Sequence, residues 1–143
     1  MANPNDQWIL LEKLGEGTYG QVYRAKHISS NELVAAKIIR MPSDEVSNEF
    51  EHELSILEKI SKQQENLPDF LGIFGDFDSF NVPRIWFIME LCSRGPIGCL
   101  LKQIEKKNHF HPSEKEKLIG YALRNTLNAL KYLHQSGIMH RGK

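Results

Sequence analysis

The sequence has 143 residues, enough for one compact domain and too few for two domains of ordinary size. Hydrophobic residues make up 41% of the chain and charged residues 25%, which excludes a disordered or fibrous protein. Eighteen basic residues balance eighteen acidic ones. The chain therefore lacks the basic surplus that sequence-independent binding to nucleic acid or to an anionic membrane requires.

Several features of the sequence indicate that the protein resides in a reducing compartment. No apolar stretch reaches the length that spans a bilayer, and the polar first residues lack the order of a secretory signal. Cys92 and Cys99 are the only cysteines, and their spacing fits no zinc site. We therefore predict a cytoplasmic protein without a bound structural metal.

Strand-like segments fill much of the first two thirds of the chain. Runs rich in apolar, β-branched and aromatic residues occur at residues 8–14, 21–27, 33–40, 67–77 and 84–91. Short polar residues at 29–32 predict a turn, because their side chains bond to the nearby backbone. A polar loop is predicted at 76–83, where Asp76 and Asp78 are expected to face water.

Three segments have helical periodicity. Apolar residues recur with that spacing over residues 44–62, 99–107 and 113–135. Gly137 follows the last segment, where a left-handed capping residue is expected. Because strands precede helices and do not alternate with them, the sequence predicts an α+β fold: an antiparallel sheet with one long helix, followed by further helices.

A glycine pattern suggests a phosphate-binding segment. Gly15, Gly17 and Gly20 would allow the backbone to approach an anion without obstruction by Cβ atoms. The same pattern occurs in dinucleotide-binding folds, where it opens a helix and precedes an acidic residue by about 20 positions. Here a strand-like segment follows Gly20, and the next marked residue is Lys37. A glycine-rich hairpin is therefore favoured over a dinucleotide-binding domain.

A lysine and a glutamate in the next segments extend this site. Ala35 and Lys37 share one face of a predicted strand, so a flat ring would find room beside the lysine. Glu53 lies between Phe50 and Leu57 on the apolar face of the predicted helix, where a carboxylate needs a cation. Lys37 is the candidate cation. The alternatives are a surface lysine and a glutamate on a partly buried stripe.

The order of these motifs resembles that of a eukaryotic protein kinase. The resemblance is carried by the glycine segment with Val22, the strand with Lys37, the helix glutamate Glu53, the segment 88–92 and His140-Arg141. The segments Leu-Gly-Glu-Gly-Thr-Tyr-Gly and Met-Glu-Leu-Cys-Ser are most similar to the germinal-centre-kinase and class III myosin branch of serine/threonine kinases.

The resemblance covers nearly the whole chain and implies one incomplete kinase domain at residues 1–143. Residues 8–91 would form the ATP-binding small lobe, and residues 92–143 the hinge and the first helices of the large lobe, ending at the catalytic loop. An intact family member uses ATP and Mg²⁺ to phosphorylate a protein substrate. No nucleic-acid partner and no membrane span are implied.

The resemblance also assigns roles to individual residues. Gly15, Gly17 and Gly20 would cover the phosphates, Lys37 would contact the α and β phosphates, and Glu53 would hold Lys37 in place. The residues implied to surround the adenine are Leu14, Val22 and Ala35 as its roof, Met89 as the gatekeeper, and Glu90 and Cys92 through hinge backbone groups. Leu57 and Phe70 would belong to the packed spine of the small lobe.

The sequence departs from the family near residue 142. The family continues His-Arg with an aspartate that accepts the proton of the substrate hydroxyl, whereas this chain has Gly142 and then Lys143. It also contains no Asp-Phe-Gly, so no magnesium ligands are implied. We expect this polypeptide to lack kinase activity and to bind ATP weakly, as a truncated kinase would. The alternative is a non-catalytic, pseudokinase-like binding module or decoy isoform.

The predicted long helix has an apolar stripe that large-lobe helices would cover in an intact kinase. The stripe includes Leu123, Leu127 and Leu130. Exposed apolar surface of this kind favours association, so we expect aggregation or chaperone contact through this helix.

Overall fold

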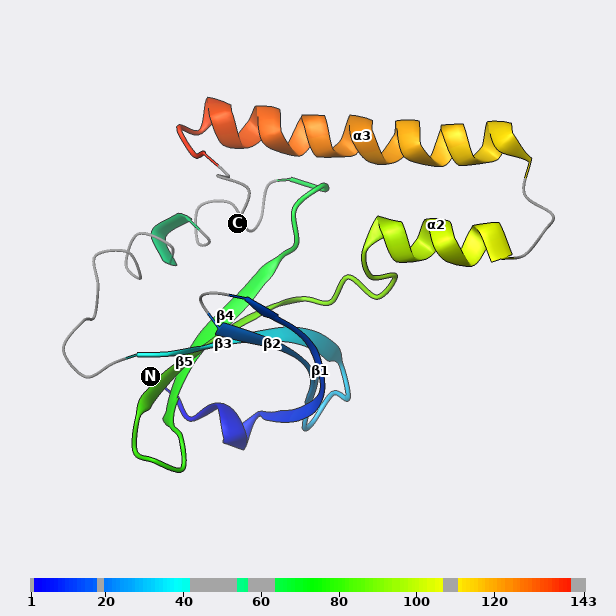
Figure 1. The fold of residues 1–143 in the computed structure, drawn as a ribbon. Helices are drawn as coiled ribbons and strands as arrows, with labels where there is room; N and C mark the ends of the chain where they lie inside the picture. Colours follow the sequence, from blue (N-terminus) through cyan, green and yellow to red (C-terminus); the bar gives the residue numbers. More distant parts are fainter. Residues whose placement is uncertain (1, 18–19, 42–53, 57–63, 107–110, 140–143) are drawn as a thin grey trace. The chain divides into compact units, whose positions relative to one another are not determined.

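The computed structural model describes residues 2–17, 20–41, 54–56, 64–106 and 111–139 (Figure 1). The chain divides into two compact units. The first contains residues 1–63 and 68–91, and the second contains residues 64–67 and 92–143. Within the described ranges, no helix is both long and apolar enough to cross a bilayer.

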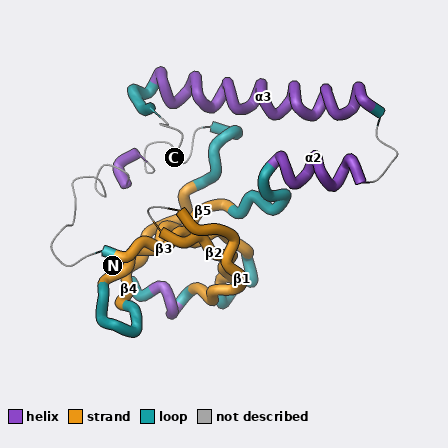
Figure 2. Tube along the Cα trace, in the orientation of Figure 1, coloured by secondary structure: helices purple, strands orange, loops and turns teal. Residues whose placement is uncertain are grey.

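The first unit is built on one antiparallel sheet (Figure 2). Its strands are β1 (Trp8–Gly17), β2 (Gly20–His27), β3 (Leu33–Arg40), β4 (Phe70–Phe77) and β5 (Pro83–Glu90). The strand order is β1-β2-β3-β5-β4, which places β1 and β4 at opposite edges. The predicted α+β fold with an antiparallel sheet is confirmed, and each predicted strand is present within a few residues of its expected bounds.

Both faces of the sheet carry apolar side chains. One face holds the larger cluster, which consists of Trp8, Ala25, Val34, Ala36, Ile38, Trp86 and Ile88. On the other face Met41, Ile85 and Phe87 pack with partly buried Ile39, Leu54, Phe70 and Ile73. Because β5 lies between β3 and β4 and contributes to both clusters, its sequence is an almost unbroken apolar run.

The helix predicted at 44–62 falls mostly outside the described residues. Residues 54–56 are helical, as expected. Glu53 and Leu57, which were assigned to this helix, lie outside the described part of the chain. Their predicted contacts therefore remain predictions.

The expectation that Asp76 and Asp78 face water was wrong. Their side chains are only 5% and 9% exposed. Asp76 lies opposite Arg84 in the β4–β5 pair and accepts hydrogen bonds from its guanidinium. Asp78 binds Arg40 of β3 through Nε at 2.7 Å. Each carboxylate is thus buried against a guanidinium, an arrangement that offsets the loss of water.

Asp78 also organises the turn between β4 and β5. Its Oδ1 accepts the backbone N–H groups of Phe80 at 2.9 Å and Val82 at 3.0 Å. The Val82 N–H, together with the Arg40 guanidinium, lowers the pKa of Asp78 below its ordinary value. Asp78 therefore stabilises the backbone of the turn. Within the same turn, Asn81 adopts a positive φ of 60°.

The second unit contains α2 (Ile97–Lys106) and α3 (Pro112–Gln135). His111 caps α3 in a capping box, because its side chain accepts the Ser113 N–H while its own N–H donates to Glu114. The predicted cap at Gly137 is confirmed by its φ of 72°. Ile138 N–H donates to Leu133 O at 2.8 Å, and Gly137 N–H to His134 O at 3.0 Å, which forms a Schellman motif.

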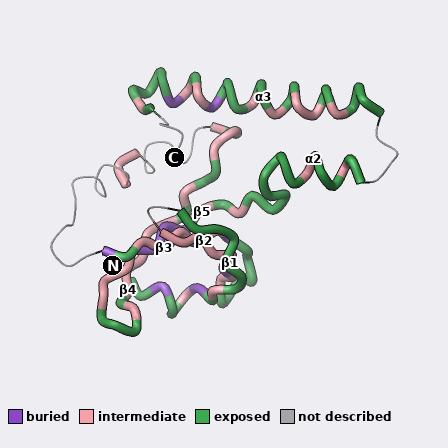
Figure 3. Tube along the Cα trace, in the orientation of Figure 1, coloured by how far each residue is buried: buried purple, intermediate pink, exposed green. Residues whose placement is uncertain are grey.

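Much of α3 is exposed (Figure 3). Tyr121, Leu123 and Leu127 are among the exposed large apolar residues, whereas Ala129 and Leu133 are the residues of this helix that are buried. Leu130 is half-buried. The predicted exposure of the apolar stripe therefore holds for Leu123 and Leu127.

Candidate functional site

The strand register brings four of the predicted site residues onto one face of the sheet. Lys37 of β3 lies opposite Val22 of β2 on one side and Phe87 of β5 on the other. Two residues along β3, Ala35 lies opposite Met89. Directly opposed residues share a face, and so do residues two apart on one strand. Val22, Ala35, Lys37 and Met89 therefore face the same way.

Lys37 lies beside an aromatic ring that the sequence analysis did not single out. Its Nζ is 5.8 Å from the centroid of the Phe87 ring, within the range of a cation–π contact. Phe87 is fully buried, and its ring is 6.4 Å from that of Phe70. Phe87 could have been found only from the register, because nothing in an apolar strand marks which residue opposes the lysine.

The three glycines differ in what the described structure requires of them. At Gly20 the φ is +144°, and an added Cβ would lie 2.3 Å from the carbonyl oxygen of Ile38. The fold itself therefore demands glycine there. At Gly15 and Gly17 no described atom lies within 4 Å of an added Cβ, and φ is outside the left-handed region. The space beside these two residues is open to a ligand.

The Glu16 side chain, between Gly15 and Gly17, has partners both within β1 and across the hairpin. The predicted hairpin is present, with Gly17 opposite Gly20 and Glu16 opposite Gln21. The Glu16 carboxylate pairs with Lys13 and accepts a hydrogen bond from Gln21 Nε2 at 3.2 Å. The Lys13 ammonium, followed by Gln21, lowers the pKa of Glu16. These exposed contacts orient the glycine segment without occupying the space beside Gly15 and Gly17.

Leu14 precedes this segment at an irregular position of the hairpin. The pairing of β1 with β2 shifts in register between Lys13 and Gly15, so Leu14 has no direct partner across the pair. Its side chain is 50% exposed. The structure thus leaves this predicted roof residue with free apolar surface beside the glycine segment.

The predicted gatekeeper Met89 and hinge residue Glu90 belong to the first unit, and the predicted hinge residue Cys92 belongs to the second. Met89 is half-buried in β5, opposite both Ala35 and Phe70. Glu90 donates its N–H to Asp69 O at 2.8 Å, and its carboxylate accepts the Asp69 N–H. Cys92 belongs to the second unit, where its thiol is exposed and its carbonyl accepts the Gly95 N–H at 3.1 Å.

The described residues hold no metal-ligand cluster, and one cavity in the second unit is lined by residues other than the predicted site residues. Among the described residues, no group of three or more His, Cys, Asp or Glu side chains is arranged to hold a metal ion. A cavity of about 290 Å³ lies in the second unit, lined by Gln64, Asn66, Asn128, Lys131, Tyr132 and Gln135. None of these lining residues was a predicted site residue.

Comparison with known proteins identifies the family. The protein kinase domain family matches residues 8–142. Human myosin-IIIa is 33% identical over 139 residues, covering 97% of this chain and 8% of the relative. Serine/threonine-protein kinase mig-15 of Caenorhabditis elegans is 34% identical over 149 residues, covering 99% and 12%. Human mitogen-activated protein kinase kinase kinase kinase 3 is 32% identical over 139 residues, covering 97% and 14%.

The chain therefore spans only a small part, 8% to 14%, of the length of these curated relatives. The predicted resemblance to the germinal-centre-kinase and class III myosin branch is confirmed. With the family match over residues 8–142 and the small-lobe sheet both in place, the chain belongs to the protein kinase domain family.

Proposed function

We propose that this chain is the ATP-binding part of a cytoplasmic serine/threonine protein kinase, which in its whole form transfers a phosphoryl group to a protein hydroxyl. One observation carries the proposal: Val22, Ala35, Lys37 and Met89 share a face of the sheet next to the glycine segment. The free thiols of Cys92 and Cys99 support a reducing compartment.

The residues present fit an adenine nucleotide. Bound ATP with Mg²⁺ supplies the phosphoryl group and the metal charge that stabilises its transfer. The open space beside Gly15 and Gly17 would let backbone N–H groups approach the phosphates, and Lys37 would supply a positive charge for them. Leu14, Val22 and Ala35 would cover the adenine, with Met89 behind it and the Glu90 and Cys92 backbone at its edge. Glu53 would hold Lys37.

Titration of the chain with ATP into the millimolar range, followed by ligand-observed NMR, tests this binding site. Lys37→Ala should weaken ATP binding about tenfold or more, because it removes the charge assigned to the phosphates. Lys117→Ala is the matched control, since Lys117 is an exposed lysine of α3 in the other unit. Equal affinities for the two variants would contradict the proposed site, and preferential binding of NAD would favour the dinucleotide alternative.

A glycine variant separates a role in binding from a role in folding. Gly17→Val places a side chain in space that no described atom occupies. We expect it to weaken ATP binding while leaving the unfolding midpoint within the range of ordinary surface variants. A large loss of stability in this variant would show instead that the fold requires the glycine.

We further propose that the polypeptide of this sequence does not itself transfer phosphate. Gly142 stands where the family has the aspartate, and glycine has no side chain to accept a proton. Incubation with radiolabelled ATP and a general protein substrate should give no more product than the Lys37→Ala variant. Transfer above that control would overturn this part of the proposal.

A second candidate function is a non-catalytic binding module that competes for the partners of an active kinase. Gly142 and the exposed apolar residues of α3 favour this function. Its test is co-precipitation with a full-length relative. Loss of the complex in a Leu123→Glu, Leu127→Glu double variant would support binding through α3, and no complex with the unaltered chain would exclude it.

A further inference from the structure

The segment that precedes β1 contacts both edges of the sheet. Residues 4–6 form a short 3₁₀ helix, η1 (Pro4–Asp6), which touches both β1 and β4. The strand order places these two strands at opposite edges. Figures 1 and 2 show η1 between them, so that the curved sheet and this segment make an almost closed ring.

Backbone hydrogen bonds fix both ends of the segment. Gly75 of β4 donates its N–H to Ala2 O at 3.2 Å. Ile28, which follows β2, donates its N–H to Gln7 O at 2.8 Å. An edge strand otherwise presents unpaired backbone groups, and the first of these bonds satisfies one of those groups on β4.

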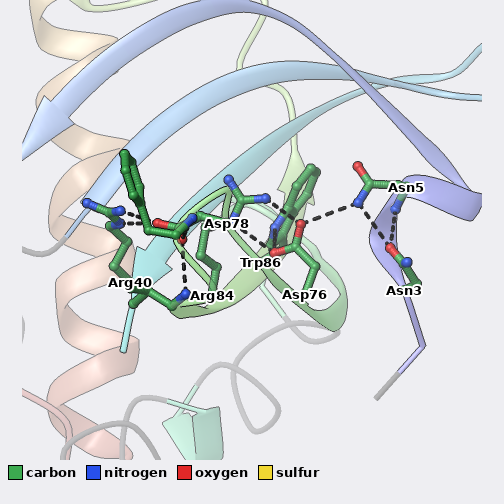
Figure 4. A network of polar contacts seen from close by, with 9 residues as sticks. Asn3, Asn5, Arg40, Asp76, Asp78, Arg84 and Trp86 are labelled. Atoms are coloured by element: carbon green, nitrogen blue, oxygen red, sulfur yellow. Dashed lines mark hydrogen bonds and ion pairs between the residues drawn. The ribbon is translucent and has the colours of Figure 1, made fainter. Parts of the chain in front are cut away.

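An asparagine links the middle of the segment to a buried carboxylate. Asn5 Nδ2 donates to Asp76 Oδ2 at 3.3 Å and to Asn3 Oδ1 at 3.0 Å (Figure 4). The same Asn3 oxygen accepts the Asn5 N–H and so caps η1. Asp76 is already paired with Arg84 and accepts the Trp86 indole N–H at 3.0 Å. The middle of the segment is therefore held to a carboxylate that Arg84 and Trp86 also bind.

Apolar contacts follow the same path. Pro4 is almost fully buried. Trp8, the first residue of β1, packs edge-to-face against Phe74 of β4, with 6.1 Å between ring centroids. Polar and apolar contacts thus join the same two strands, although these strands share no backbone pairing.

We propose that residues 2–7 are a clasp that closes the sheet by holding β4 to the start of β1, with the Asn5–Asp76 hydrogen bond as its latch. The clasp fixes the two edge strands relative to each other at the end of β1 that is remote from the glycine segment. At the glycine end, β1 pairs with β2, with Gly17 opposite Gly20. The clasp therefore anchors the end of β1 that begins at Trp8.

Hydrogen exchange of the whole chain, measured by mass spectrometry and resolved at single residues, tests the clasp without any nucleotide. The Gly75 N–H reports on clasp opening because it donates to Ala2. Asn5→Ala should raise its exchange rate about tenfold, the effect of losing one modest hydrogen bond. Amide groups within the β3–β5 pair should keep their rates. Asn128→Ala, an exposed asparagine of α3, is the matched control.

A second variant predicts an order of exchange rates and not only a single increase. Asn5→Asp places a carboxylate next to the buried Asp76 carboxylate, so it should open the clasp further than Asn5→Ala does. The expected order of Gly75 exchange rates is wild type, Asn5→Ala, then Asn5→Asp. Unchanged Gly75 exchange in both variants would overturn the proposal, as would an equal rise across the β3–β5 amides, which would indicate general destabilisation.

Discussion

The two units of the chain are stabilised in different ways. The first unit buries apolar side chains on both faces of a sheet and pairs its buried carboxylates with guanidinium groups. The second unit has a long helix with well-formed caps at both ends, yet few of its side chains are buried. The comparison shows that local sequence signals suffice to define a helix, whereas the sheet depends on contacts between residues distant in the sequence.

The largest expected difference concerns one buried and one exposed side chain. Trp86→Ala should lower the free energy of unfolding by about 3–5 kcal/mol, because it leaves a cavity in the sheet core. Trp86 is 1% exposed, whereas Leu127 of α3 is 64% exposed. Leu127→Ala should change stability by less than about 0.5 kcal/mol. Urea denaturation followed by far-UV circular dichroism measures both, and similar losses would contradict the contrast between the units.

The next effect distinguishes two glycines within the first unit. Gly20→Ala should cost about 2 kcal/mol, since it forces a side chain into a left-handed backbone against the Ile38 carbonyl. Gly15→Ala meets no described atom and should leave the unfolding midpoint almost unchanged. Denaturation of the two variants side by side checks this prediction. A larger loss of stability in Gly15→Ala than in Gly20→Ala would contradict it.

A smaller effect is expected at the end of α3. Gly137→Ala should weaken the helix terminus by about 1 kcal/mol, because an L-residue is strained at a φ of 72°. Faster hydrogen exchange at Ile138, whose N–H donates to Leu133, is the measurable result. Exchange of strand amides in the first unit should not change, and a change there would contradict an effect confined to the helix terminus.

The smallest effect is a pH dependence in the turn between β4 and β5. The pKa of Asp78 is lowered below its ordinary value of 3.8, so the stabilisation it provides is present above that pH and is lost as the pH falls through the lowered pKa. Asp78→Asn should therefore be less stable than wild type near neutral pH, and the gap should narrow in acid. Thermal unfolding from pH 2 to pH 7 tests this, and a gap that widens in acid would refute it.

Sequence patterns predicted the secondary-structure elements well, but they predicted contacts between distant residues poorly. Apolar runs located all five strands, and Gly137 marked the end of α3. Asp76 and Asp78 were misplaced because their partners depend on register: Arg84 faces Asp76 only once β4 and β5 pair. The capping role of His111 was also missed, since histidine is not among the residues that typically begin helices.

The candidate site, like the fold, was predicted where it depends on one strand and missed where it depends on strand pairing. Strand alternation placed Ala35 and Lys37 on one face, and the register adds Val22 and Met89 to that face. Phe87 was not predicted, because its position beside Lys37 follows from the β3–β5 pairing alone. The contact proposed between Lys37 and Glu53 stays a prediction, as Glu53 lies outside the described residues.

The vacant surroundings of Gly15 and Gly17 have an evolutionary consequence. No described atom lies within 4 Å of a Cβ added at either position, so we expect replacement by alanine to leave folding intact. Selection for a correctly folded chain would then not remove such replacements, whereas selection for the proposed nucleotide binding would. In relatives that have lost ligand binding, we therefore expect Gly15 and Gly17 to be replaced by other residues first, while Gly20 is retained.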